Sequence, residues 1–359
     1  MQLFEPVDEA AFRRLISGER RGVNAGLLRT ALQTASVGYR AAIGLRAGLY
    51  KAGLRRIHQA AVPVISVGNI TTGGTGKTPI VALVCRMLQT CGVSPGIISR
   101  GYRSFDGLPN DEKLVLSLQC PDVPHEQNAD RVAAAADTLR GHAVDAIVMD
   151  DGFQHRRLHR DLDMVLIDAT NPFGYGHVLP RGLLREPLSA LGRADVVLIT
   201  RSDLVNESAL AAIQTRLLRS APGLDGRILR VAFRPASLLS VEGQRHALSS
   251  VAGQPVFLVS GIGNPEAFAA TCRNAGLQIA GSRWFADHHH YSDSDLQEVQ
   301  AKARLSDATR IITTLKDLVK IKATQEHVLA LEITPEFPVA GQCDTMQELI
   351  RCCLTKKAG

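Results

Sequence analysis

A glycine-rich segment with one lysine and one threonine is the clearest candidate for chemistry in this chain. It reads Gly73-Gly74-Thr75-Gly76-Lys77-Thr78-Pro79 and lies between the apolar run 62–67 and the amphipathic run 80–88. Glycines let backbone N–H groups turn inward around a polyphosphate, while a new helix offers unpaired N–H groups and the positive end of its dipole. Strand, glycine loop and helix in this order predict a P-loop, in which Lys77 reaches the β- and γ-phosphates and Thr78 holds Mg²⁺.

This loop departs from the strict G-x-x-x-x-G-K-[ST] pattern, because the first position is Thr71. Its context supports the assignment, and Pro79 suits the first helical turn, where a missing N–H costs nothing. The alternative is a glycine-rich turn with an incidental lysine. The apolar run before it and the helical pattern after it favour the P-loop.

Two adjacent carboxylates follow another apolar run. Residues 144–149 lead into Asp150-Asp151-Gly152-Phe153-Gln154-His155, at the carboxyl end of a strand that we expect beside the P-loop. In P-loop enzymes an acid at this place holds Mg²⁺, and the metal neutralises charge that develops on the transferred phosphoryl group. The alternative for Asp150 and Asp151 is a pair of turn or helix-capping residues, which the P-loop makes the weaker interpretation.

The composition is that of an ordinary globular protein with room for two domains, since the chain has 359 residues of which 45% are hydrophobic. Its formal net charge of +6 suggests anionic partners such as phosphates or acidic lipid. Five Tyr and one Trp speak against a base-stacking surface, so we predict no nucleic-acid partner. Seven cysteines without a C-x-x-C pair indicate neither a disulfide framework nor a zinc site, and a reducing cytosol explains them most simply.

The segment 20–60 is basic and carries no acidic residue. Apolar residues at near-helical spacing stand between its charges, while the chain has neither a cleavable signal pattern nor an apolar run long enough to span a bilayer. A helix lying on an anionic membrane surface fits this pattern. A helix packed on its own domain with a solvated basic face fits it equally well.

Strands and helices alternate along the chain, which predicts a doubly wound parallel sheet. Strand patterns occur at 62–67, 96–99, 143–149, 163–167 and 195–199. An extended stretch of alternating apolar and polar residues follows around 226–239. A second alternation of strands and helices starts with the apolar run 256–260. We predict an α/β fold with a basic amphipathic segment (1–60), a P-loop domain (61–228) and a smaller α/β domain with linker strands (229–359).

Two further turns have a structural interpretation. Asn264 followed by Pro265 indicates an N-cap with proline at the first helical position, so the glycine-rich turn from Gly261 opens a helix. The sequence Thr200-Arg201-Ser202-Asp203 is faintly similar to the base-recognition loop of GTPases, but a turn at a strand end explains it better.

Several motifs occur together in one order along the chain. They are Ser66-Val-Gly-Asn-Ile70, Ser99-Arg-Gly-Tyr102, Asp150-Asp-Gly-Phe-Gln-His155, Leu184-Arg-Glu-Pro187 and Asp287-His-His-His-Tyr-Ser-Asp293. Between about residues 62 and 320 the chain resembles the tetraacyldisaccharide 4'-kinase family, which phosphorylates the lipid A disaccharide. The resemblance implies two α/β/α domains joined by a β-strand linker, an active site in the cleft between them, and a basic N-terminus that docks on a membrane.

The resemblance also implies roles for individual residues. ATP phosphate binding falls to Thr71, Thr72, Gly73, Gly74, Thr75, Gly76, Lys77 and Thr78, with Arg185 close to the phosphates. The metal side comprises Thr78, Asp150, Asp151 and Glu186. The catalytic pair corresponds to Asp111 and His288, in which a carboxylate orients an imidazole so that the pair accepts the sugar hydroxyl's proton. Which of the two takes the proton stays open.

The chain departs from the family pattern at three places. Gly-Asp-Glu-Pro is Asn110-Asp111-Glu112-Lys113 here, which makes Asp111 the weakest part of the alignment. Ala286 replaces the proline before Asp287-His288, and Leu315 replaces the glutamate of Thr-Glu-Lys-Asp. Adjacent histidines such as His288-His289-His290 also suggest a metal site, but they rarely converge on one ion and lack partners at ligand spacing.

We therefore predict a peripheral kinase on the cytoplasmic face of the bacterial inner membrane. It uses ATP and Mg²⁺ to phosphorylate the 4'-hydroxyl of tetraacyldisaccharide 1-phosphate, without an obligate protein partner. Two rivals remain: a P-loop GTPase or ATPase of metallochaperone type, and a nucleotide-gated membrane adaptor without catalytic activity.

Overall fold

The computed structural model describes residues 9–101, 110–321 and 327–355, so Tyr102 of the Ser99–Tyr102 motif lies outside the described residues. One twelve-stranded sheet runs through the molecule in the order β10-β9-β11-β12-β7-β6-β5-β1-β4-β2-β3, with β8 beside β7. The strands are β1 (Val64–Asn69), β2 (Pro95–Ser99), β3 (His125–Gln127), β4 (Ala146–Asp150), β5 (Leu162–Asp168), β6 (Val196–Thr200), β7 (Ile228–Ser240), β8 (Arg245–His246), β9 (Pro255–Ser260), β10 (Gln278–Trp284), β11 (Arg310–Thr314) and β12 (Val328–Glu336). The helices are α1 (Glu9–Ser17), α2 (Val23–Lys51), α3 (Lys77–Thr90), α4 (Asp111–Gln119), α5 (Arg131–Gly141), α6 (Glu207–Ser220), α7 (Pro265–Asn274), α8 (Asp293–Leu305), α9 (Leu315–Leu318) and α10 (Gln342–Thr355).

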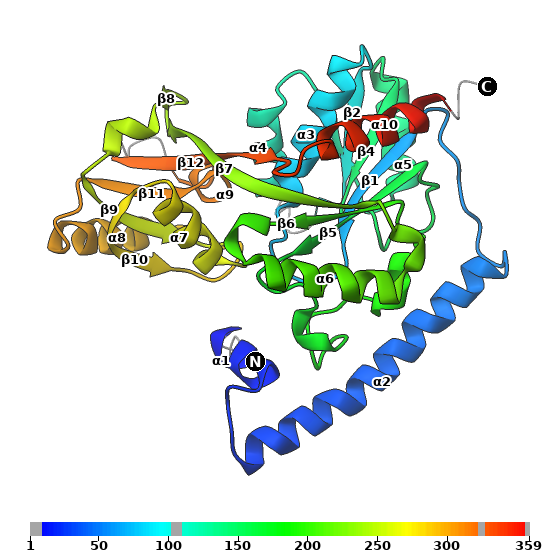
Figure 1. The fold of residues 1–359 in the computed structure, drawn as a ribbon. Helices are drawn as coiled ribbons and strands as arrows, with labels where there is room; N and C mark the ends of the chain where they lie inside the picture. Colours follow the sequence, from blue (N-terminus) through cyan, green and yellow to red (C-terminus); the bar gives the residue numbers. More distant parts are fainter. Residues whose placement is uncertain (1–8, 102–109, 322–326, 356–359) are drawn as a thin grey trace.

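In the order of the sheet, the neighbouring strands β6, β5, β1, β4, β2 and β3 are parallel, and helices cover both faces of this part (Figure 1). Its central strands are buried along their whole length, as expected for apolar runs between two helical layers. Apolar side chains of α3 and α10 pack on one face, and those of α6 pack on the other. The predicted doubly wound α/β class is thereby confirmed.

Strand β7 connects this sheet to the strands of the second half. Its residues 228–231 pair in parallel with β6, and its residues 232–240 pair antiparallel with β12. Beyond β12 the strands β11, β9 and β10 are again parallel, and α7 and α8 cover opposite faces of them. β7 occupies the extended stretch predicted around residues 226–239, while the division of the chain at residues 60 and 228 remains our proposal.

Helix α2 lies at the outside of the molecule as a 29-residue arm (Figure 1). Only Ala25 and Ser36 are buried along it, and α1 packs beside its beginning.

Helix α4 was not predicted from the sequence. Asn110 caps it by accepting a hydrogen bond from the backbone N–H of Lys113 at 2.9 Å, and Asp111 is its first residue.

The carboxyl ends of β1, β4 and β6 meet at one edge of the parallel sheet. In open α/β sheets this edge is where ligands bind. The predicted P-loop follows β1, and Asp150 and Asp151 stand at the end of β4. Residues that are far apart in the sequence are therefore placed together by the sheet.

Candidate active site

The P-loop joins the end of β1 to the first turn of α3. Gly76 is the N-cap of α3 with φ +83°, a conformation that favours glycine. A Cβ at Gly76 would lie 2.4 Å from Cζ of Phe233 on β7, so a side chain does not fit there. The predicted strand, glycine loop and helix are thus present, and they bring β7 directly against the loop.

Buried hydrogen bonds hold the loop in place. The Asn69 amide donates to the Thr75 hydroxyl at 3.0 Å, and the Thr200 hydroxyl donates to the Thr75 carbonyl at 2.9 Å. On the opposite side, the backbone N–H of Thr72 donates to the Leu183 carbonyl at 2.8 Å, and that of Arg185 donates to the Ile70 carbonyl at 2.7 Å. These contacts hold the loop at Thr72 and Thr75 and anchor its start at Ile70, and an anion site needs such a preorganised backbone.

Lys77 and Arg185 both pair with Asp151. The Lys77 ammonium lies 3.5 Å from Oδ1 of Asp151, and Arg185 donates to both carboxylate oxygens at 3.0 and 2.9 Å. Burial raises the pKa of Asp151, but Lys77 and Arg185 outweigh it and hold that pKa well below its usual range. Asp151 has a φ of 54°, in the left-handed region, and such backbone strain is common at functional sites.

Asp150 is buried at the end of β4, and its Oδ1 has no hydrogen-bond partner among the described residues. Burial, together with Glu112 and Asp151, raises its pKa to about 7 against the opposing effect of Lys77. An orphaned buried carboxylate oxygen next to a P-loop suits Mg²⁺, which is bound by one or two carboxylates together with substrate phosphates. The described residues contain no group of three or more His, Cys, Asp or Glu that could hold a metal ion.

Glu186 is engaged by two arginines. Its Oε2 lies 3.1 Å from Arg156 and 3.1 Å from Arg193, and Arg193 also donates to Oε1 at 3.2 Å. The carboxylate is buried, so these ion pairs compensate for its desolvation. The predicted role of Glu186 at the metal stays a prediction.

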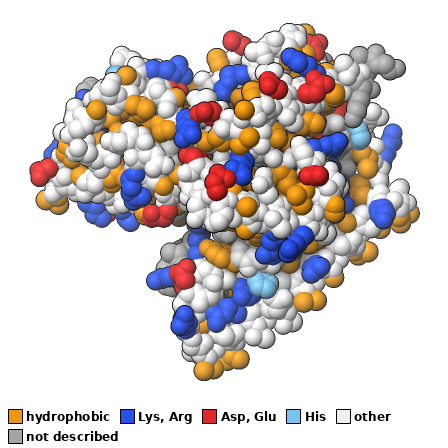
Figure 2. All heavy atoms as spheres, viewed as in Figure 1, with side chains coloured by type: hydrophobic (Ala, Val, Ile, Leu, Met, Phe, Trp, Pro, Cys, Tyr) orange, Lys and Arg blue, Asp and Glu red, His pale blue; other side chains and the backbone are white. Residues whose placement is uncertain are grey.

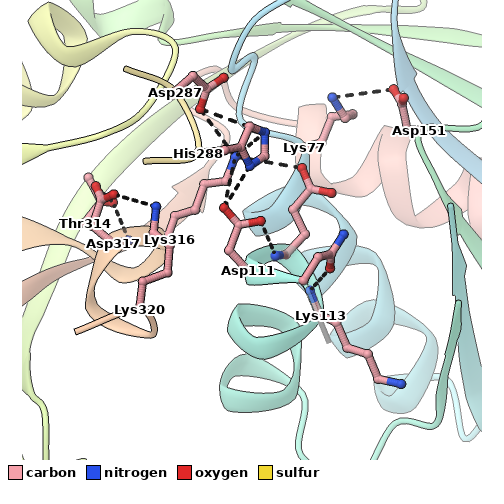
Figure 3. Close-up of polar contacts among 12 residues, drawn as sticks. Lys77, Asp111, Lys113, Asp151, Asp287, His288, Thr314, Lys316, Asp317 and Lys320 are labelled. Carbon is pink, nitrogen blue, oxygen red and sulfur yellow. Dashed lines mark hydrogen bonds and ion pairs between the residues drawn. The ribbon is translucent and has the colours of Figure 1, made fainter. Parts of the chain in front are cut away.

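Asp111 and His288 meet across the two halves of the sheet. Nδ1 of His288 lies 3.0 Å from Oδ2 of Asp111, with both side chains largely buried (Figure 3). Burial raises the pKa of Asp111, but the hydrogen bond from His288 and the charge of Lys316 lower it to about 2. The structure therefore supports the alignment of Asp111, despite its altered flanking residues.

Lys316 completes this cluster, although sequence reasoning did not single it out. Its ammonium donates to Nε2 of His288 at 3.3 Å and lies 3.7 Å from Asp111 and 3.6 Å from Asp287 (Figure 3). Burial lowers the pKa of Lys316, but Asp287 and Asp111 outweigh it and raise that pKa. The available signal was its place in Thr314-Leu315-Lys316-Asp317, the segment that corresponds to the family's Thr-Glu-Lys-Asp.

One cavity connects the cluster to the P-loop. Its lining includes residues 74–79 of the P-loop and the start of α3, Glu112 of α4, and Asp287 and Lys316 from the second half of the sheet. The turn 261–264 closes it from the second half, since a Cβ on Gly263 would lie 2.9 Å from the backbone nitrogen of Gly74. Asn264 caps α7 as predicted, and the same turn also contacts the phosphate loop.

The neighbouring histidines do not converge on one point. His289 contacts Asp295 at 3.1 Å and stacks on Phe285, while His288 faces Asp111. Residues 202–204 form a short 3₁₀ turn after β6, as the strand-end interpretation predicted.

Comparison with known proteins identifies relatives along most of the chain. The profile of the family described as "Tetraacyldisaccharide-1-P 4'-kinase" matches residues 28–351. A tetraacyldisaccharide 4'-kinase of Geobacter metallireducens (strain ATCC 53774 / DSM 7210 / GS-15) is 39% identical over 308 residues, which cover 81% of this chain and 88% of the relative. A protein of the same name from Anaeromyxobacter sp. (strain Fw109-5) is 36% identical over 358 residues, which cover 94% and 95%.

A solved structure shares the fold. It is a crystal structure of an "apo" form of LpxK from Aquifex aeolicus in complex with ATP, with a TM-score of 0.72 and 26% identity over 91% of this chain and 99% of that one. Together these matches confirm the resemblance on which the site residues were predicted. The chain belongs to the tetraacyldisaccharide-1-P 4'-kinase family.

Proposed function

We propose that this protein moves the γ-phosphate of ATP to the 4'-hydroxyl of an acylated glucosamine disaccharide 1-phosphate, with the Asp111–His288 pair accepting the hydroxyl's proton. As a family member it is a phosphotransferase of lipid A biosynthesis that uses ATP and Mg²⁺. The contact of Asp111 with His288 carries the residue-level proposal, because it stands beside a cavity whose other wall is the P-loop. A hydrolase would need neither a base from the second half nor an acceptor groove.

The transfer step follows from these positions. The hydroxyl oxygen forms a bond to the γ-phosphorus, the bond from that phosphorus to the β–γ bridging oxygen breaks, and the electron pair leaves with ADP. The proton passes to the Asp111–His288 pair, while Lys77 accompanies the charge on the β- and γ-oxygens. When bound, Mg²⁺ neutralises phosphate charge, and Asp150, Asp151 and Thr78 are the residues that would hold it.

Lys77 must change partners for this role. Its ammonium lies 3.5 Å from Asp151, whereas Arg185 holds the same carboxylate at 2.9 Å and can retain it. We infer that phosphate draws Lys77 away while Arg185 keeps Asp151 oriented. One guanidinium nitrogen of Arg185 donates to both oxygens of Asp151, at 3.0 and 2.9 Å, and such a charge-assisted contact can hold the carboxylate in place.

A groove of 830 Å³ between α2 and the segments 156–160 and 186–193 is our candidate for the acceptor. This volume is in the range of small-molecule sites. Basic residues for a phosphate line it together with apolar and small residues for acyl chains: Arg40, Lys51, Arg156, Arg160 and Arg193 with Ile43, Gly44, Ala47, Gly48, Ile57 and Leu158. Glu186 also lines the groove, next to the Arg185 that pairs with Asp151.

Helix α2 supplies the proposed docking surface on an anionic membrane. At about 100° per residue, Val23, Leu27, Val37 and Leu45 fall within an arc of roughly 80°, on the side opposite the buried Ala25 and Ser36. The side chains of Val23, Leu27, Val37 and Leu45 are between 62% and 80% exposed, and Figure 2 shows hydrophobic and basic side chains together along this arm. No helix in the described ranges is long and apolar enough to cross a bilayer.

Phosphate transfer from labelled ATP to purified acceptor lipid in detergent micelles tests the proposal. We expect labelled lipid and acceptor-dependent loss of ATP. ATP or GTP hydrolysis that ignores the acceptor would favour the GTPase or ATPase rival. Nucleotide and liposome binding with no turnover would favour the adaptor.

A further inference from the structure

We propose that Lys316 is a positioning residue that fixes the tautomer of His288. Its ammonium donates to Nε2, so that the ring proton resides on Nδ1 and is donated to Asp111. This inference rests on the proposed function only in that Asp111 and His288 are taken as the proton-accepting pair.

The hydrogen-bond chemistry of the three groups allows one arrangement. A lysine ammonium has donors and no acceptor, so the nitrogen that it approaches at 3.3 Å must present a lone pair. That nitrogen is Nε2 of His288, and a neutral imidazole then carries its proton on Nδ1. Nδ1 lies 3.0 Å from Oδ2 of Asp111, which accepts that proton's hydrogen bond.

Lys316 is held in this position by the local fold. It belongs to the single-turn helix α9, which Thr314 caps by accepting a hydrogen bond from the Asp317 N–H at 3.2 Å. The fully buried Asp317 accepts hydrogen bonds from the Thr314 hydroxyl at 2.7 Å and from the backbone N–H of Gly261 at 3.1 Å. Lys320 pairs with the other oxygen of Asp317 at 3.0 Å.

The loop of His288 is built on the same anchor. The His288 backbone N–H donates to the Gly261 carbonyl at 3.1 Å, and its φ of 64° lies in the left-handed region. Asp317 therefore ties Lys316 and His288 together through Gly261. A strained loop that neighbouring groups hold is what a positioned reacting group requires.

Charged groups from every neighbouring element keep the lysine protonated. Asp111 and Glu112 face it from α4 at 3.7 and 4.0 Å, and Asp287 faces it from the histidine loop at 3.6 Å. Both nitrogens of His288 are engaged, whereas each oxygen of Asp111 keeps a second lone pair beyond the one used toward the Glu112 N–H at Oδ1 or toward His288 at Oδ2. Asp111 is therefore the group left to receive the hydroxyl's proton. The positive charge of the Lys316 ammonium, 3.3 Å from Nε2, also opposes protonation of His288 itself.

The first test is ¹⁵N NMR of histidine-labelled, nucleotide-free protein at neutral pH, with His288 assigned from the spectrum of His288→Gln. We expect wild-type His288 to be the neutral Nδ1–H tautomer, and Lys316→Met to shift it toward Nε2–H or a mixture. Lys316→Arg should keep the Nδ1–H form, because guanidinium is also charged and donor-only. A wild-type Nε2–H tautomer, or a spectrum unchanged in Lys316→Met, overturns the proposal.

The second test separates positioning from phosphate binding. Lys316→Met should lower kcat about 10²-fold, the cost of a misplaced reacting group, while the Kd for ATP stays within about twofold and the acid limb of the pH–rate profile moves up. Lys316→Arg should recover part of kcat, and the exposed Lys302→Met should match wild type. A rise in the Kd for ATP as large as the loss of kcat would make Lys316 a phosphate ligand instead.

The tautomer test can fail independently of the proposed reaction. If the wild type transfers no phosphate to the disaccharide, the proposed function fails, whereas the tautomer of His288 is still read from protein without acceptor or nucleotide.

Discussion

The imidazole of His288 lies 3.0 Å from the carboxylate of Asp111, although 177 positions separate them in the chain. Asp111 begins α4 beside the parallel sheet, and His288 stands in a loop of the second half. If they act as one proton-accepting unit, Asp111→Ala and His288→Ala should each lose most of kcat and still bind ATP. The double variant should be little worse than either single one, because residues of one catalytic unit are strongly non-additive. Losses that multiply in the double variant would separate their roles.

Lys77→Ala should reduce phosphate transfer by about 10²-fold or more, because a preorganised charge at the β- and γ-phosphates is lost. The measurement is initial rate with labelled ATP and acceptor lipid. Lys302→Ala is the matched control, since Lys302 is an exposed residue that pairs only with the nearby Glu298 among the ion pairs described. Retention of more than about a tenth of the activity would contradict the role of Lys77.

Gly76→Ala should destabilise the protein. The residue has a φ of +83° and a Cβ would lie 2.4 Å from the Phe233 ring, so left-handed strain and overpacking together cost roughly 2–4 kcal/mol. Both the Tm of thermal unfolding and the rate of phosphate transfer should fall. Gly141→Ala, at an exposed helical position with nothing within 4 Å of its Cβ, should leave the Tm unchanged or raise it. Equal Tm values for the two variants would argue against the close approach of β7 to the loop.

Stability should depend on pH through Asp111. Its pKa in the folded protein is lowered from 3.8 to about 2, so its contribution is fully present above about pH 4 and is lost as the pH falls toward 2. The difference in free energy of unfolding between wild type and Asp111→Asn should shrink by about 2 kcal/mol over that window. Denaturant titrations at pH 5 and pH 2.5 measure it, and a constant difference would refute the lowered pKa.

Reversing the charges of α2 and its flank should weaken membrane binding. We expect Arg40, Arg46, Arg55 and Arg56 changed together to Glu to reduce binding to anionic liposomes, and added salt to do the same to wild type. The control changes the same number of exposed arginines elsewhere, namely Arg219, Arg273, Arg304 and Arg351. Unchanged partitioning of the α2 variant, or an equal loss in the control, would leave the helix without a specific docking function.

The P-loop could be predicted from the sequence because its signal is contiguous. A strand, glycines, lysine and helix within 62–88 determine the local backbone and the orientation of its N–H groups. The doubly wound sheet followed for the same reason, since each strand and helix has its own period. The roles of Asp111 and His288 came from resemblance alone, because no local pattern relates residues in separate halves.

The tertiary structure alone brought Lys316 to His288 and decided which face of α2 is left uncovered. The periodicity of α2 distinguishes its faces but does not say which one packs, and the burial of Ala25 and Ser36 answers that. Leu315-Lys316-Asp317 has no catalytic signature, yet β11 and the buried Asp317 set the ammonium 3.3 Å from Nε2 of His288. The physical reason is the same for both: sequence period determines local geometry, whereas contacts between distant segments depend on how the sheet and its buried polar anchors assemble.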